Sequence, residues 1–383
     1  MIRRVLLVLA LTLGHGGSAV AEDTETVLVA RRAAQALAEA AVALEEARAA
    51  RDRVAALTRV VRAYEDGLAA LRAGLREAIL REREIAAGFE ARRAEIMQLT
   101  GALAGMEQNR GPLLLLHPAG PVGTARSGMI VADLTLAMQA EAARLGDDLR
   151  DVALLRSLQE GAVATLNDGL HGAQEARLEL SRALAERGPV PEQDEAERQA
   201  LAAILESADT LESFAEGLTW LPPGQAGAGN AAFDTAFDTA RGVLPWPVAG
   251  HVLRGFGEED AAGVARPGLL VAAAPQALVS APAAGTVRYA GPLLDYGNVM
   301  VLEPAPGYLM VLAGLEVLHA ATGQVVAAGA PLGLMGGARP SAADVLGWAQ
   351  DGGGEAGQET LYIELRENGA PVDPAPWFAP ERG

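Results

Sequence analysis

Few residues of this chain carry side chains suited to metal or nucleophilic chemistry. The sequence contains five histidines and no cysteine, so catalysis by a thiol is excluded. Imidazoles and carboxylates are the usual ligands of a catalytic zinc ion, which keeps one further position open for water. The last third of the chain holds only the histidines His251 and His319, which lie far apart in the sequence. Neither histidine belongs to a recognisable metal-binding motif.

A series of short motifs runs through the same part of the sequence. It begins with Leu-Pro-Trp-Pro at 244–247 and ends with Glu-Leu-Arg at 364–366 and Pro-Val-Asp-Pro at 371–374. Between them follow Gly255–Gly257, Ala284–Val287, Tyr289–Gly291, Tyr296–Asn298 and Gly329. In this order, the motifs resemble a LytM or lysostaphin-type peptidase domain over residues 244–380. Short β-prone runs separated by Gly and Pro agree with a compact, mostly antiparallel β domain.

Active members of that family hold one zinc ion with two histidines and one aspartate, and a further histidine assists the attacking water. On the resemblance, the first histidine falls at Arg266 and the aspartate at Leu270. The assisting histidine falls at Gly314, and a His-x-His motif falls at Thr360 and Tyr362. A cation and a leucine where metal ligands belong cannot hold Zn²⁺. The resemblance therefore implies a domain with no metal cofactor and no catalytic residues.

The cleft of such a domain remains available for binding a protein. Its former ligand positions are small, apolar or aromatic, and tyrosine and arginine are enriched at binding hot spots. Tyr362 is either a contact residue or a filler of the space left by zinc. On the same resemblance, the candidate groove contacts are Leu270, Tyr296, Val299, Leu312, Tyr362 and Arg366.

The first half of the chain predicts long helices, so the expected fold class is α+β. Apolar residues recur at an average spacing of about 3.5 residues, which is the coiled-coil pattern. The residues in this frame are Val54, Leu57, Val61, Tyr64, Leu68, Leu71 and Leu75. Leu37 and Leu44 extend this helix upstream, and a second stretch continues the pattern to Leu180. Because Gly and Pro interrupt the pattern, residues 22–188 are expected to form an antiparallel hairpin with its tip at about 109–128. An intermolecular coiled coil is the alternative.

An amphipathic helix is predicted within residues 189–221. It must bury its apolar stripe on another surface, either the base of the hairpin or the C-terminal domain, and the sequence favours neither. The stripe includes Leu201, Leu205, Leu211 and Phe214. Residues 222–243 indicate a flexible linker. In the C-terminal domain, residues 337–359 form an insertion in which Ser341–Trp348 predicts a short helix, placed either over the groove or in a solvent-exposed loop.

Residues 1–21 have the features of a cleaved signal peptide. Arg3 and Arg4 precede the apolar run Val5–Leu13, and the small residues 19–21 provide a cleavage site. The apolar run is too short to cross a bilayer, which requires about 20 residues. The prediction is an exported, periplasmic protein of a Gram-negative bacterium. The net charge of −18 argues against nucleic acid as a partner.

The combination of an export signal, a coiled-coil hairpin, an amphipathic helix and a ligand-free LytM domain resembles the EnvC-type murein hydrolase activators. In that family the degenerate domain binds a cell-wall amidase, and a helix of the activator occupies the groove at rest. The coiled coil docks on an ABC-type division complex in the inner membrane. The resemblance implies these partners, with peptidoglycan as a further candidate, and a restraining role for residues 189–221. An active zinc endopeptidase and a wall-binding scaffold are the alternative functions.

Overall fold

The computed structural model describes most of the chain. The described residues are 19–108, 120–187, 195–219, 221, 237, 239–259, 263, 265–350 and 357–380. The predicted signal peptide up to residue 18 and residues 109–119 of the predicted hairpin tip lie outside them. So do most of the predicted linker and residues 351–356 of the insertion.

The chain divides into two compact units. One comprises residues 1–32 and 74–162, and the other comprises residues 33–73 and 163–383. Long helices make up the first half of the described chain and antiparallel strands most of the second, so the predicted α+β fold class is confirmed. No helix in the described part of the chain is both long and apolar enough to cross a membrane.

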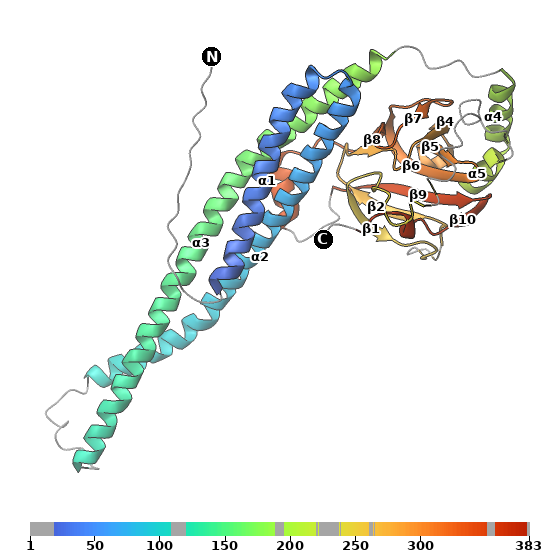
Figure 1. Cartoon of the computed structure of the whole chain (residues 1–383). Coiled ribbons are helices and arrows are strands. Elements are labelled where there is room, and N and C mark those ends of the chain that lie inside the picture. Colours follow the sequence, from blue (N-terminus) through green and yellow to red (C-terminus); the bar gives the residue numbers. More distant parts are fainter. Residues whose placement is uncertain are drawn as a thin grey trace. The chain divides into compact units, whose positions relative to one another are not determined.

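Two of the long helices form an antiparallel hairpin. The long helices are α1 (Ala19–Arg48), α2 (Arg53–Gln108) and α3 (Gly120–Ala185) (Figure 1). Glu65 of α2 pairs with Arg177 of α3 at 2.7 Å, and Glu82 pairs with Arg156 at 2.8 Å. Residue numbers that increase along α2 are therefore paired with decreasing numbers along α3, so the two helices are antiparallel, as the hairpin prediction requires.

The apolar frame predicted for α2 lies in the helical core. All seven frame residues from Val54 to Leu75 are at most 5% exposed. In α3, Leu166 and Leu180 are fully buried on the matching face. The 3–4 spacing in the sequence therefore marks the face that each helix buries.

The first helix is not the upstream extension of α2 that the apolar pattern predicts. α1 ends at Arg48, and the chain turns before α2 begins. The side chain of Asp52 accepts a hydrogen bond from the backbone amide of Ala55 at 3.0 Å, which is an N-cap that starts a new helix.

After this turn, α1 and α2 run antiparallel to each other. Leu37 lies against Gly67, and Val29 lies against Gly74, so positions that rise in α1 fall in α2. The helices also approach closely elsewhere: a Cβ at Gly172 of α3 would stand 2.4 Å from the ring of Tyr64. The correction to the prediction is a third bundle helix in place of one longer arm.

Two short helices replace the single amphipathic helix predicted within residues 189–221. They are α4 (Glu195–Ser207) and α5 (Leu211–Thr219). Between them, the amide of Ser213 donates to the hydroxyl of Thr210, and the amide of Thr210 donates to the hydroxyl of Ser213, both at 3.1 Å. This reciprocal capping satisfies the free amides of a first turn and starts α5 as a separate helix.

The C-terminal domain is built on one antiparallel sheet. Its strands are β1 (Gly250–Arg254), β2 (Leu269–Ala273), β3 (Leu278–Ser280), β4 (Gly285–Pro292), β5 (Asn298–Ala305), β6 (Tyr308–Leu318), β7 (Val325–Val326), β8 (Pro331–Met335), β9 (Glu359–Glu367) and β10 (Ala370–Val372). The main path runs β1-β2-β9-β6-β5-β4-β7. β10 pairs with β9, and β8 joins β3 to β6.

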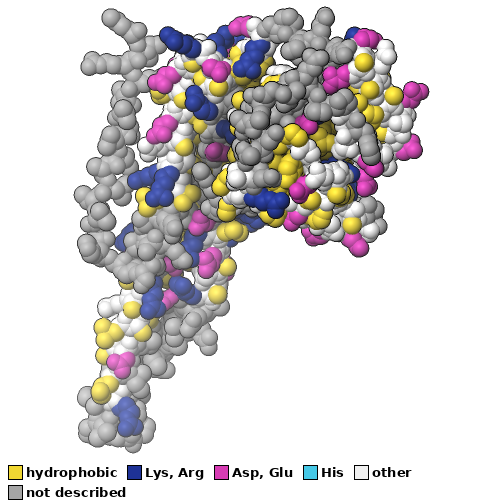
Figure 2. Space-filling view, turned by 45° about the vertical axis from the view of Figure 1, so that its right-hand side comes forward, with side chains coloured by type: hydrophobic (Ala, Val, Ile, Leu, Met, Phe, Trp, Pro, Cys, Tyr) yellow, Lys and Arg dark blue, Asp and Glu magenta, His cyan; other side chains and the backbone are white. Residues whose placement is uncertain are grey.

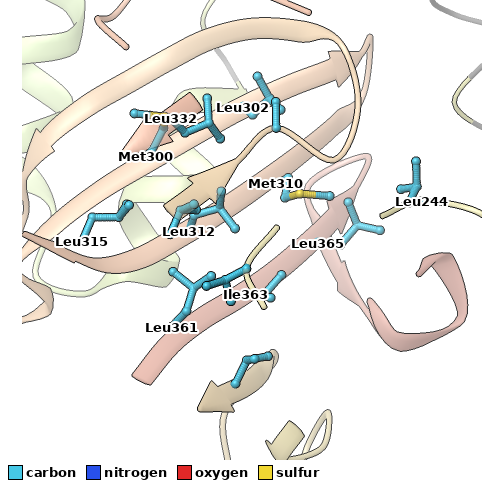
Figure 3. Close-up of a cluster of buried hydrophobic side chains, with 14 of the residues drawn as sticks. Leu244, Met300, Leu302, Met310, Leu312, Leu315, Leu332, Leu361, Ile363 and Leu365 are labelled. Atoms are coloured by element: carbon cyan, nitrogen blue, oxygen red, sulfur yellow. The ribbon is translucent and has the colours of Figure 1, made fainter. Parts of the chain in front are cut away.

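The sheet buries apolar side chains on both faces. Along β9, Leu361, Ile363 and Leu365 point into the main core (Figure 3), while Tyr362 and Glu364 point to the other side. Side chains alternate between faces along a strand, so residues 361–365 point in turn into the main core and to the opposite face of the sheet. The second face is covered by α4 and α5 and is called here the helix-covered face.

A short helix, α7 (Ala342–Gln350), occurs in the insertion, where the sequence predicts one. Ser341 caps it, since its hydroxyl donates to Asp344 at 2.7 Å and the amide of Asp344 donates back at 3.2 Å. Among the described residues, neither apolar cluster of the β domain includes a residue of α7. The structure therefore gives no support to α7 as a cover of the helix-covered face.

Candidate binding site at the degenerate metal positions

One row of residues crosses the sheet from its β1 edge towards β5. The register pairs are Arg254 with Leu270, Leu270 with Tyr362, Tyr362 with Ala313, and Ala313 with Val299. Residues directly opposite each other on neighbouring strands point to the same face of a sheet. The row is therefore one continuous surface.

Two of the positions that the resemblance equates with zinc ligands lie on this row. Leu270 and Tyr362 are neighbours in it, and both line a small pocket with Arg266, which precedes β2. Gly314 lies beside Thr360: a Cβ at Gly314 would stand 2.6 Å from the carbonyl oxygen of Thr360. The φ of Gly314 is also +99°, a conformation that favours glycine. None of these five positions carries a side chain that binds zinc.

These side chains do not fit a zinc ion. The pocket has a volume of about 10 Å³, which is room for about one water molecule. Its lining includes Arg254 and Arg266 but a single acidic residue, Glu258, and positively charged side chains repel a cation. Within the described residues, no three His, Asp or Glu side chains are grouped to hold a metal. The site does not fit zinc because its side chains offer too few metal-binding atoms.

The two histidines of the domain lie elsewhere. His251 is exposed on β1, where its register partner is Ala272. The backbone amide of His319 donates to the carbonyl of Leu332 at 2.7 Å, and burial lowers the pKa of its imidazole. Neither side chain lines the pocket, so neither replaces a lost ligand.

Three residues of β9 form a buried polar chain beside the row. The hydroxyl of Tyr362 donates to Oε2 of Glu364 at 2.7 Å, and Nη1 of Arg366 donates to Oε1 of Glu364 at 2.7 Å. Arg366 also donates to the carbonyl of Gly369. Burial raises the pKa values of both Tyr362 and Glu364. Arg366, at 3% exposed, is therefore tied to the domain itself and not presented as a contact.

The helices α4 and α5 cover the middle of the row. Phe214 is fully buried and meets the ring of Tyr289 edge-on, with 4.8 Å between ring centroids. The buried residues that α4, α5 and the turn between them contribute are Leu201, Ala208, Leu211, Phe214, Ala215 and Leu218. Ile204 of α4 packs against Gly217 of α5, where a Cβ would stand 2.7 Å away. The apolar stripe therefore docks on the C-terminal domain, which decides between the two surfaces that the sequence left open.

The predicted groove contacts divide into three groups. Val299 and Tyr362 lie on the helix-covered face, with Leu270 and Tyr296 partly buried at its edge. Arg366 is inside the polar chain. The prediction that Leu312 belongs to the groove is wrong, because Leu312 points into the main core.

Alternation along β6 explains the error at Leu312. The side chains of β6 that reach the helix-covered face are Leu309, Val311 and Ala313. None of these three residues was predicted from the sequence, although the period of two in an apolar strand would have placed them opposite Leu312.

Comparisons with known proteins agree with this architecture. Residues 265–374 match the model of peptidase family M23. Over 206 residues, the chain is 29% identical to the murein hydrolase activator EnvC of Escherichia coli, covering 54% of this chain and 45% of that protein. An uncharacterized protein of Neisseria meningitidis is 32% identical over 156 residues, which is 41% of this chain and 23% of that protein. The chain thus spans less than half the length of either relative.

The solved structures include a peptidase M23 from Pseudomonas aeruginosa. It is 20% identical, with a TM-score of 0.31, and the match covers 51% of this chain and 67% of that one. Together with the match to the family, the motifs and the sheet identify the C-terminal part of the chain. It is a LytM-type domain of peptidase family M23, in a chain that is similar to EnvC over about half of its length.

Proposed function

We propose that this chain is a non-catalytic activator of peptidoglycan amidases that works in the periplasm of a Gram-negative bacterium during septal wall splitting. One observation carries the proposal: around β9, the positions that hold zinc in the family carry no ligand side chains, and the sheet face there is an apolar surface covered by helices. Similarity to a murein hydrolase activator supports the same function.

The chemistry at the row supports binding over catalysis. Metal-assisted hydrolysis needs a Lewis acid or an activated water, and Leu270, Gly314 and Thr360 supply neither. Tyr362 is not a general base, because burial raises the pKa of its hydroxyl, which stays protonated and donates a hydrogen bond to Glu364. What remains is a row of aromatic and aliphatic side chains suited to an apolar partner.

In this proposal, α4 and α5 restrain the groove. Leu211, Phe214 and Leu218 occupy the apolar face that a partner would need. An amidase segment and α5 then compete for one surface, and activation requires the helices to leave. Binding on that surface draws an inhibitory helix of the amidase out of its own active site.

The long helices are proposed to dock on an ABC-type division complex in the inner membrane, whose ATP cycle releases the restraint. Large apolar side chains on α2 and α3 of the first unit are exposed: Met97 by 63%, Met129 by 69% and Leu136 by 64%. These are side chains that such a contact would bury.

Two assays with the purified mature chain test the proposed function. In a zymogram, the chain alone should leave peptidoglycan intact, with or without added zinc. In a dye-release assay, it should stimulate the cell-wall amidase of the same organism, and more strongly when residues 195–219 are removed. Chelator-sensitive hydrolysis by the chain alone would establish a zinc endopeptidase instead. Wall binding without stimulation of any amidase would establish a scaffold.

A further inference from the structure

Two arginines at the β1 end of the row have no ionic partner among the described residues. Arg254 is half-buried on β1, and Arg266 is exposed just before β2. Elsewhere in the domain, Arg241, Arg288 and Arg366 each pair with a glutamate. Unpaired arginines side by side are unfavourable unless something of opposite charge joins them.

Both arginines line the small pocket beside Leu270 and Tyr362. Glu258, the one carboxylate in the lining, already accepts a hydrogen bond from the amide of Gly255 at 2.8 Å. The pocket therefore carries a net positive charge in a chain whose net charge is −18. In Figure 2, acidic side chains are spread along the right-hand side of the view and basic ones are sparse there.

The restraining helices do not use this end of the row. None of the residues that line the pocket belongs to α4 or α5. Among the described residues, no carboxylate of α5 pairs with either arginine. Glu212 of α5 instead lies near Glu364, and the like charge adds to the burial that raises the pKa of Glu364. When α4 and α5 cover the row, Arg254 and Arg266 at its β1 end are therefore left without a counter-charge.

We propose that Arg254 and Arg266 bind a carboxylate side chain on the amidase segment that enters the groove. The inference rests on the proposed function and names the chemistry of that partner: an apolar segment with an Asp or Glu at the β1 end. Guanidiniums hold carboxylates through paired, charge-assisted hydrogen bonds. The pocket, of about 10 Å³, has room for about one water-sized group.

The surroundings of the pocket favour a protein segment over a free wall peptide. Leu270 and Tyr362 continue the apolar row directly from the pocket. A segment that offers apolar side chains next to its acid buries both residues, whereas a short wall peptide offers the carboxylate alone.

This site also explains how a partner can displace a helix of the same chain. A tethered segment competes at an effective concentration of about millimolar, so an equal set of contacts would leave α5 in place. Pairing with Arg254 and Arg266 is a contact that α5 lacks, and it stabilises the partner without stabilising the restraint.

The test measures binding of the organism's cell-wall amidase to the full mature chain and to its variants. Arg254→Gln and Arg266→Gln together should weaken the affinity by about tenfold or more. The variant should also bind with a flatter dependence on salt, because the screened charge pairs are gone. Arg339→Gln, an exposed arginine of the same domain outside the pocket, should bind like wild type. Arg266→Gln alone keeps the test valid if the half-buried Arg254 proves necessary for folding.

Each outcome decides a different question. If the wild type binds and the double variant binds equally well, the carboxylate site is wrong and the proposed function stands. If neither the wild type nor the chain released by Leu211→Asp with Phe214→Asp binds the amidase, the proposed function fails, and this inference fails with it. A parallel pull-down on purified sacculi distinguishes the source of the carboxylate: loss of wall binding with intact amidase binding would assign the arginines to peptidoglycan and overturn the proposal.

Discussion

At the scale of single residues, Tyr362 shows how one position can serve as both filler and contact. It stands where the family has the last histidine of its metal site, and its ring takes up space between Leu270 and Ala313. Its hydroxyl is held by Glu364. The ring also belongs to the surface that α5 covers, so the two roles weighed from the sequence are compatible in the structure.

Substitutions at Tyr362 separate the ring from the hydroxyl. Tyr362→Ala should abolish amidase stimulation, because it removes the aromatic centre of the row. Tyr362→Phe should retain stimulation and lose about 1 kcal/mol of stability from the missing hydrogen bond. Dye release and thermal melting measure the two effects. Stimulation by a folded Tyr362→Ala variant would leave the residue only a structural role.

Arg366 is expected to matter for stability and not for direct contact. Arg366→Ala leaves the carboxylate of Glu364 buried at 1% exposure with no counter-charge, which costs about 3–5 kcal/mol. Denaturant unfolding followed by tryptophan fluorescence measures the loss. Arg339→Ala, on the surface, should change stability by less than about 0.5 kcal/mol. A small effect at Arg366 would mean that water reaches the pair.

Which residues lie near the candidate site was easier to predict from the sequence than the direction in which their side chains point. The motif spacing placed Arg266, Leu270 and Tyr362 at one site, and the fold brings them to one pocket. Arg366 was chosen for its residue type, but burial beside Glu364 reverses its role. Direction in a strand depends on register, which is a property of pairing between distant segments and not of local sequence.

At the scale of elements, the pair α4–α5 is the feature most open to test. Leu211→Asp with Phe214→Asp places charges in a fully apolar interface, which costs several kcal/mol and should release the helices. Amidase stimulation should rise, and limited proteolysis should cut within 195–219 sooner. Glu216→Ala, on the exposed side of α5, is the matched control and should change neither. Misfolding of the sheet without added stimulation would make α5 a plain part of the core.

A milder variant separates α4 from α5 without touching the sheet. A methyl group at Gly217 would stand 2.7 Å from Cγ2 of Ile204, so Gly217→Ala should push the two helices apart. We expect an increase in stimulation smaller than that of the charged variant and a modest loss of stability of about 1–3 kcal/mol. Unchanged amidase stimulation by the Gly217→Ala variant would show that α4 does not contribute to the restraint.

Local pattern predicted the elements where neighbours in sequence are neighbours in space. The frame of α2 was legible because positions three and four apart share a helix face. The turn at Asp52 could not be predicted in this way, because an alanine-rich apolar pattern runs across it. Only the packing of α1 against Gly67 and Gly74 shows that the chain reverses direction there. The break before Leu211 carried a local signal in the Thr210 and Ser213 caps, which the apolar stripe outweighed.

At the scale of the whole molecule, the bundle and the β domain can be followed with separate probes. The four tryptophans lie at 220, 246, 348 and 377, outside α1, α2 and α3. Gly172→Ala sets a methyl group 2.4 Å from Tyr64 and should destabilise the bundle by about 1–3 kcal/mol. Tyr64 and Gly172 belong to the same compact unit as the β domain, and Glu65 accepts a hydrogen bond from the amide of Leu278 at 2.8 Å. The midpoints of the helical circular dichroism signal and of the tryptophan transition should therefore fall together. A fall in the helical signal alone would show that the bundle unfolds independently of the β domain.

The order of helices followed by a β domain was predictable from composition and period alone. Which surface receives the stripe of α4 and α5 was not, since either the bundle or the sheet could bury leucine and phenylalanine. That choice depends on the shape of the surface that receives the stripe. In the structure, Tyr289 and the residues of β6 on the helix-covered face form that surface.

The backbone at Gly314 has a consequence for engineering a metal site. A histidine at that position would need a left-handed φ of +99° and would bring its Cβ within 2.6 Å of a carbonyl on β9. Placing histidine and aspartate side chains at the family's ligand positions therefore meets a steric barrier before any ion is bound. Side-chain replacement alone would not build a zinc site here, because the backbone of β6 would also have to move.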